Sequence, residues 1–152
     1  MSKDHLSYTV LKDIGFRLLA EGKTIRIKAE GISMYPSIKS GSVIFIEPFE
    51  QGVLPVHGDI IAWKRDSGII VHRLISIYRQ KNQTYFVTRG DCSLAEDEPF
   101  LFDQIAGKVV RIEKPEGKPV SPSKYINKKP NYSFNRFLVR IISQFYRIKR
   151  AF

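Results

Sequence analysis

The sequence predicts a mainly β domain with one helix at each end, and three observations support this class. Short runs of alternating apolar and β-branched residues recur through the middle of the chain, which is typical of strands. Glycine, proline and asparagine turn signals separate these runs. Both ends instead carry apolar residues at helical spacing. We therefore expect a domain over residues 1–118, a proline-containing connector over 119–133 and an amphipathic helix over 134–152.

A first helix is expected over residues 5–21, where Gly22 is placed to end it. The β core is predicted over 24–115 and begins with a strand at 24–29, which alternates with period two and leads into a turn at Gly31. Further strands are expected at 42–46, 60–64, 69–78, 84–89 and 108–113.

Charge is concentrated in the C-terminal tail. The 152 residues carry a formal net charge of +10, and no Asp or Glu follows Glu116. Nine Lys and Arg residues do follow it, so that 10 − 9 leaves residues 1–116 with a charge of +1. The basic character therefore belongs to the tail and not to the β domain.

Composition and targeting signals favour a cytoplasmic protein. The single Cys92 excludes an internal disulfide, which fits a reducing compartment. No run reaches the roughly 18–20 apolar residues of a membrane span, and the N-terminus lacks the apolar stretch of a signal peptide. The expected location is the cytoplasm, with peripheral attachment to the inner membrane face through the tail.

Ser33 is the candidate nucleophile. It follows a predicted strand and lies between Gly31 and Pro36, on a turn where side chains tend to be exposed and backbone N–H groups free. A serine hydroxyl needs a neighbouring base, and free N–H groups can stabilise an oxyanion. The competing interpretation is an ordinary serine in a surface turn.

His72 is the candidate general base. Strand parity places it on the same face as Ile70 and Leu74, and partial burial keeps an imidazole neutral. The alternative is a half-buried histidine bonded to backbone. Either Asp91 or Asp97 is a candidate to orient the ring, and spacing does not choose between them. The remaining histidines are isolated, so we expect no metal and no cofactor.

Four sequence blocks carry a resemblance to a known family. They are Gly31-Ile32-Ser33-Met34-Tyr35-Pro36-Ser37-Ile38, Gly58-Asp59-Ile60-Ile61, Val71-His72-Arg73-Leu74 and Gly90-Asp91. In order and approximate spacing they resemble the type I signal peptidases, in the Ser-His branch found in endoplasmic-reticulum and archaeal members. That family shares its fold with the LexA-type repressors. The resemblance covers about residues 24–115 and lacks the membrane anchor usual in the family.

The resemblance implies a serine endopeptidase that cleaves extended signal or leader peptides with small residues before the cut. Ser33 matches the family's nucleophile and His72 its base, while Asp91 and Asp97 match two supporting aspartates. The block around the serine implies oxyanion or substrate-binding positions at three residues: Gly31, Met34 and Pro36. The alternative function is a catalytically silent module of the same fold that binds peptides or membranes.

The tail predicts an interaction surface. Over 134–152, apolar residues form one helical stripe and arginines line another face, a pattern that suits an anionic membrane surface. Packing of the stripe on the β domain is the competing prediction. The few aromatics placed to stack on bases do not favour nucleic acid as a partner. The expected partners are a peptide or preprotein substrate and an anionic membrane.

Overall fold

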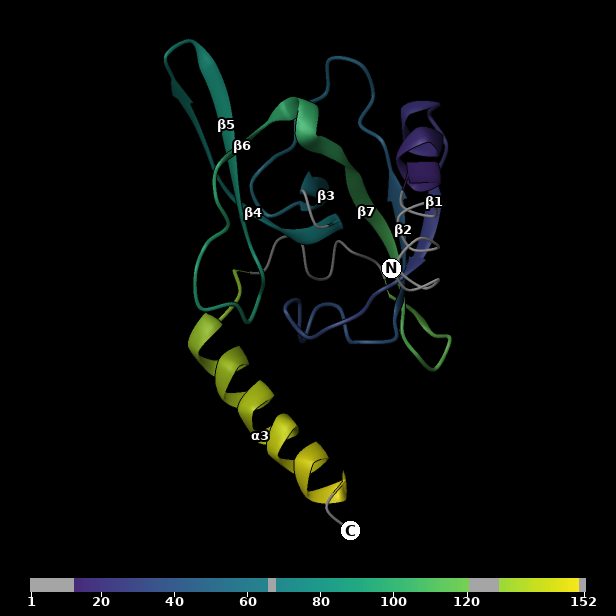
Figure 1. The fold of residues 1–152 in the computed structure, drawn as a ribbon, viewed down its shortest axis with the longest axis vertical. Coiled ribbons are helices and arrows are strands. Elements are labelled where there is room, and N and C mark those ends of the chain that lie inside the picture. Colours follow the sequence, from purple (N-terminus) through teal and green to yellow (C-terminus); the bar gives the residue numbers. More distant parts are fainter. Residues whose placement is uncertain (1–12, 66–67, 121–128, 151–152) are drawn as a thin grey trace, which may run out of the picture.

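The structure, a computed structural model, describes residues 13–65, 68–120 and 129–150. One antiparallel sheet dominates it (Figure 1). Its strands are β1 Ile25–Lys28, β2 Val43–Glu47, β3 Ile60–Arg65, β4 Gly68–Gln80, β5 Gln83–Arg89, β6 Phe100–Leu101, β7 Ile105–Glu113 and β8 Pro119–Val120. They follow the order β1-β2-β7-β3-β4-β5-β6, and β8 pairs with β7. The predicted class, mainly β with a helix at each end, is confirmed.

Most strands lie where alternation predicted them, with ends shifted by no more than three residues. The turn between β4 and β5 lies at the predicted turn signal, and Lys81 and Asn82 there have φ values of 46° and 66°. Two successive left-handed residues give the tight hairpin turn whose twist matches its strands. The sequence did not predict β6, β8 or the short 3₁₀ helix Phe102–Gln104, because two or three residues show no periodicity.

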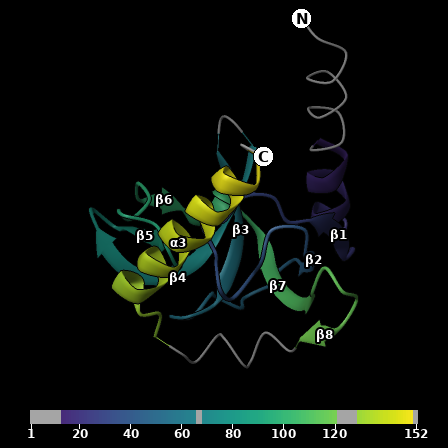
Figure 2. The same cartoon turned by 90° about the horizontal axis from the view of Figure 1, so that it is seen from below.

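The two ends are helical within the described residues. Residues 13–20 form a helix beside β1, while the rest of the helix predicted over 5–21 lies mostly outside the described residues (Figures 1 and 2). The C-terminal helix α3 spans Tyr132–Arg150. It begins earlier than predicted because the Oδ1 atom of Asn131 accepts the Phe134 N–H at 3.1 Å, as an N-cap does.

Parts of the connector and tail lie outside the described residues, namely 121–128 and 151–152. No helix in the described part of the chain is both long and apolar enough to cross a membrane.

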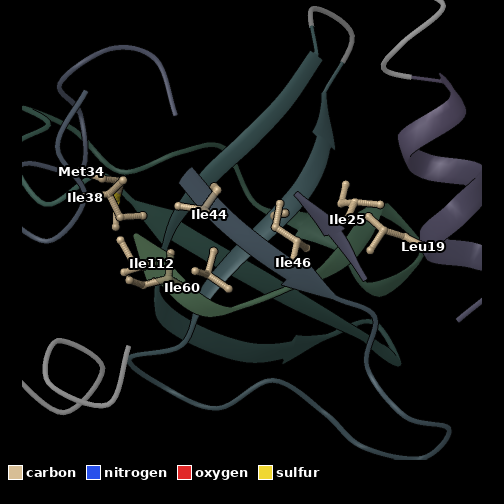
Figure 3. Close-up of a cluster of buried hydrophobic side chains, with 10 residues drawn as sticks. Leu19, Ile25, Met34, Ile38, Ile44, Ile46, Ile60 and Ile112 are labelled. Carbon is tan, nitrogen blue, oxygen red and sulfur yellow. The ribbon is translucent and has the colours of Figure 1, made fainter. Parts of the chain in front are cut away.

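Two apolar clusters hold the sheet together. The first joins the N-terminal helix to the sheet through Leu19 and Ile25, and at its other end it buries Met34 and Ile38 (Figure 3). The second surrounds Trp63, whose ring stacks on Phe100 with centroids 4.2 Å apart. The first cluster therefore anchors the segment that follows β1, which carries the candidate nucleophile.

Among the described residues, strand pairing leaves two edges unpaired next to one cleft. There β1 ends the sheet and pairs only with β2. In β4, residues 68–72 pair with β3 alone, because pairing with β5 begins at Arg73. Residues from β1 and from this first part of β4 both line the cleft described below.

Candidate active site

Ser33 lies in a turn that is anchored on both sides. Gly31 precedes it with φ of +79°, a left-handed conformation that favours glycine. Met34 is buried to 5% exposure in the first core cluster, so the residue after the serine fixes the turn. Ser33 itself is only partly buried. The core therefore presents this hydroxyl in a defined position next to the cleft.

The structure brings Ser33, His72 and Asp97 into one hydrogen-bonded line. His72 Nε2 lies 3.0 Å from Ser33 Oγ, and His72 Nδ1 lies 2.6 Å from Asp97 Oδ2. An ionised carboxylate only accepts hydrogen bonds, so Nδ1 carries the proton in this arrangement. In the neutral ring Nε2 is then the acceptor, and the serine hydroxyl donates to it. This is the tautomer that a general base for Ser33 requires.

The Asp97 carboxylate is held ionised by its surroundings. The side chains of His72 and Asp97 are only 13% and 12% exposed. Burial alone would raise the pKa of Asp97, but hydrogen bonds from His72 and Thr88 and the positive charges nearby hold it below its ordinary value. Thr88 Oγ1 donates to Asp97 at 2.7 Å and accepts from Trp63 Nε1 at 3.0 Å. Through Thr88, the hydrogen bonds of Ser33, His72 and Asp97 therefore connect to Trp63 in the second core cluster.

Asp91 lies in a different network. Its carboxylate accepts from Arg73 Nε and Nη2, each at 2.8 Å, and from the Ser37 hydroxyl. Arg73 and Asp91 are buried to 3% and 1% exposure, and Arg73 also donates to the Gly58 carbonyl. Of the two candidate aspartates, the structure therefore brings Asp97 to His72 and Asp91 to Arg73. This buried, hydrogen-bonded ion pair fixes the relative positions of β4, the serine turn and the loop after β5.

Comparison with known proteins gives the family of the chain. The family model described as Peptidase S24-like matches residues 4–109, which include Ser33, His72 and both aspartates. The chain belongs to the Peptidase S24-like family. The resemblance to signal peptidases is also borne out by curated relatives.

Two curated relatives of this S24-like chain are signal peptidases. It is 26% identical over 109 residues to the catalytic subunit sec11 of the signal peptidase complex of Schizosaccharomyces pombe, covering 60% of this chain and 57% of the relative. It is 30% identical over 84 residues to signal peptidase I W of Bacillus subtilis, covering 55% of this chain and 44% of the relative. The chain therefore spans about half the length of the curated relatives it matches.

An apolar cleft of about 450 Å³ opens beside the Ser33 and His72 pair of this S24-like protein. Gly31 and Met34 line it, whereas Pro36 lies outside the lining. Most of the other lining side chains are aliphatic: Ile25, Ile27, Ala29, Ile38, Ile44, Ile69, Ile70 and Val71. Lys28 and Glu30 also line the cleft, and its aliphatic part suits small or aliphatic side chains.

Backbone donors are available at the serine turn. Within the described residues, the N–H groups of Ser33 and Met34 have no hydrogen-bond partner. Such donors can stabilise the negative charge that develops on a carbonyl oxygen under attack. No group of three or more His, Cys, Asp and Glu side chains is arranged to hold a metal ion in the described ranges.

Gly90 lets the loop after β5 approach the site. A Cβ atom at this position would lie 2.8 Å from the Ser33 carbonyl oxygen and 3.1 Å from His72 Nε2, and would also overlap Ser93 Oγ. We expect Gly90→Ala to displace Ser33 or His72 and lower kcat/KM by about 10²-fold, since misplacement by about 1 Å costs that much. Peptide hydrolysis and thermal unfolding of the variant measure the two effects separately.

A matched control for Gly90→Ala is Gly52→Asn, an exposed turn glycine with open space where a Cβ would lie. Asparagine tolerates the left-handed conformation of Gly52, with φ of +82°. Activity of Gly90→Ala equal to that of wild type would show that Gly90 does not set the site geometry.

Several residues of the site had no role in the sequence-based hypothesis. Arg73 and Ser37 stand in the quoted blocks, and Arg next to the proposed base was the one available signal. Thr88 carried no signal, although it is fully buried and bonds to Asp97. Asn135, whose contact is described below, lies in a helix whose pattern suggested only a surface.

Proposed function

We propose that this chain is a serine endopeptidase in which Ser33 is the nucleophile and His72 the general base. The single observation that carries the proposal is that His72 is hydrogen-bonded through Nε2 to Ser33 Oγ and through Nδ1 to Asp97 Oδ2. The S24-like family and the signal peptidase relatives support it. Asp91 is then a structural residue, because its carboxylate is occupied by Arg73 and Ser37.

The reaction proceeds by acyl transfer. Ser33 Oγ attacks the scissile carbonyl carbon while its proton passes to His72 Nε2, and the N–H groups of Ser33 and Met34 bind the oxyanion. Asp97 stabilises the imidazolium that forms. His72 then gives the proton to the leaving amine, so that the peptide C–N bond breaks and an ester on Ser33 remains. Water, deprotonated by His72, hydrolyses this ester and restores the serine hydroxyl.

The proposed substrate is an extended peptide with small or aliphatic residues before the cut. The unpaired edges of β1 and of residues 68–72 flank the cleft, and a strand-like peptide can hydrogen-bond to both. Alternate side chains then enter the aliphatic lining. Signal or leader segments of preproteins have this character, in keeping with the names of the two relatives.

The direct test is hydrolysis of a peptide library by the purified chain, with products identified by mass spectrometry. The proposal predicts cleavage after small residues in extended peptides, absent in Ser33→Ala. The rival function is a silent module that binds the same peptides. Tight binding without products, unchanged in Ser33→Ala, would support this module and contradict the endopeptidase.

The outer face of α3 is the proposed membrane contact. Phe134 and Phe137 are 54% and 58% exposed, and the same helix carries Arg136 between them and Arg140 after them. Each basic residue near an anionic surface contributes about 1 kcal/mol, to which partly buried aromatic rings add. The predicted packing of the whole stripe against the β domain does not account for these two exposed rings.

We expect the chain to sediment with vesicles that contain anionic phosphatidylserine and to stay in solution with zwitterionic vesicles. Phe137→Ser should lower the partition coefficient by about tenfold, since it removes one large buried apolar group. Ser143→Ala, an exposed change on the same helix, should leave it unchanged. Equal sedimentation with both vesicle types would contradict the proposed contact.

A further inference from the structure

The first turn of α3 contacts the loop that carries Asp97. This loop, residues 90–99, joins β5 to β6, and α3 begins beside it before running away from the sheet (Figures 1 and 2). Asn135 is buried to 6% exposure although Phe134 beside it is exposed. Its Nδ2 atom donates to the backbone carbonyl of Asp91 at 2.9 Å. The buried Asn135 side chain thus makes a hydrogen bond to the backbone of the 90–99 loop, which indicates that α3 holds this loop in place.

A second contact lies one turn earlier. The Arg89 guanidinium carbon is 3.9 Å from the centre of the Tyr132 ring, a cation–π contact. Arg89 Nη2 donates to the carbonyls of Ser93 and Leu94, each at 3.2 Å. Tyr132 therefore packs on Arg89, the residue that is hydrogen-bonded to the middle of the 90–99 loop.

The same loop is bonded to the catalytic residues. The Cys92 N–H donates to the Ser33 carbonyl at 2.9 Å, and Cys92 Sγ lies 2.7 Å from the Ile32 carbonyl oxygen. Toward the other end of the loop, the Asp97 N–H donates to the Thr88 carbonyl at 2.8 Å, and the Asp97 carboxylate is hydrogen-bonded to His72. Displacement of the loop would thus move the serine backbone and the carboxylate together.

We propose that Asn135 and Tyr132 of α3 are positioning residues that hold the 90–99 loop closed against Ser33 and His72. The catalytic consequence rests on the proposed endopeptidase function, whereas the loop closure does not. These residues lie outside the segment 4–109 that the family model matches. Arg73 and Ser37 hold Asp91 independently, and for that reason loss of the α3 contact should loosen the loop without abolishing the site.

Cys92 provides a reporter that needs no turnover. It is the only cysteine of the chain, and burial raises the pKa of its thiol, which makes labelling of the closed loop slow. The experiment measures the labelling rate of Cys92 by a disulfide reagent in the full chain. We expect Asn135→Leu and Tyr132→Leu to raise this rate by about five- to tenfold, the factor that one hydrogen bond contributes.

Two variants serve as controls. Tyr132→Phe keeps the ring over Arg89, and Ser143→Ala changes an exposed side chain farther along α3. Both should label at the wild-type rate. Thermal unfolding of each variant separates loop opening from global unfolding, and if Asn135→Leu does not fold, the comparison of Tyr132→Leu with Tyr132→Phe decides.

Activity supplies the second readout. In Asn135→Leu and Tyr132→Leu, kcat should fall by about five- to tenfold while KM changes less than about twofold, because neither substituted residue lines the cleft. Labelling at the wild-type rate in both folded leucine variants would overturn the proposal, whatever their activity. If Cys92 is labelled faster in the leucine variants but the wild-type chain hydrolyses no peptide, the loop contact is supported and only the proposed endopeptidase function is contradicted.

Discussion

Ser33→Ala is expected to lower kcat/KM for a cleaved peptide by at least about 10⁴-fold, because removal of the nucleophile leaves only binding and oxyanion stabilisation. The substitution deletes one partly exposed hydroxyl, so the thermal midpoint should stay close to that of wild type. Steady-state hydrolysis and thermal unfolding of the purified variant check both parts.

The control for Ser33→Ala is Ser40→Ala, an exposed serine farther along the same loop. It should retain wild-type hydrolysis. Loss of activity in both variants, or in neither, would show that Ser33 has no special role.

Asp97→Asn is expected to lower kcat by about 10³- to 10⁴-fold. An amide facing His72 Nδ1 can present its NH₂ group, which favours the tautomer with the proton on Nε2. That ring cannot accept the Ser33 proton. KM should change little, because the carboxylate does not line the cleft. An Asp97→Asn enzyme with wild-type kcat would contradict the orienting role.

Asp97 also predicts a pH dependence of stability. Because its pKa is lowered in the folded state, the unfolded chain takes up this proton first as the pH falls. The stabilisation is fully present well above the unfolded value of about 3.9 and is lost as the pH drops through the folded value. The free energy of unfolding, measured with urea between pH 7 and pH 3, should therefore fall less steeply with decreasing pH in Asp97→Asn than in wild type. The same pH dependence of the free energy of unfolding in both proteins would show that Asp97 does not contribute to it.

Sequence patterns were sufficient for the strands and for the expectation that Ser33 and His72 lie close together. Alternation over several residues identifies a strand, and Asn82 is a residue type that tolerates the left-handed conformation of a two-residue hairpin turn. Parity along β4 placed His72 with Ile70 and Leu74, and these two apolar residues do share the second cluster. The order of the blocks then suggested that Ser33 and His72 meet.

Long-range contacts were beyond the reach of these patterns. Asp91 and Asp97 lie in one loop without periodicity, and their directions depend on Arg73 from β4 and Thr88 from β5. The role of Asn135 depends on where α3 begins and on a backbone carbonyl distant in sequence. Local spacing carries no information on either contact.

The proposed mechanism requires Ser33 and His72 to act as one catalytic unit. A double-mutant cycle is the decisive experiment, with kcat/KM measured for one cleaved peptide in wild type, Ser33→Ala, His72→Ala and the double variant. Residues that act as a unit give non-additive losses. We predict that all three variants fall to the same residual rate. Losses that multiply in the double variant, or hydrolysis that survives in Ser33→Ala, would contradict the proposed mechanism.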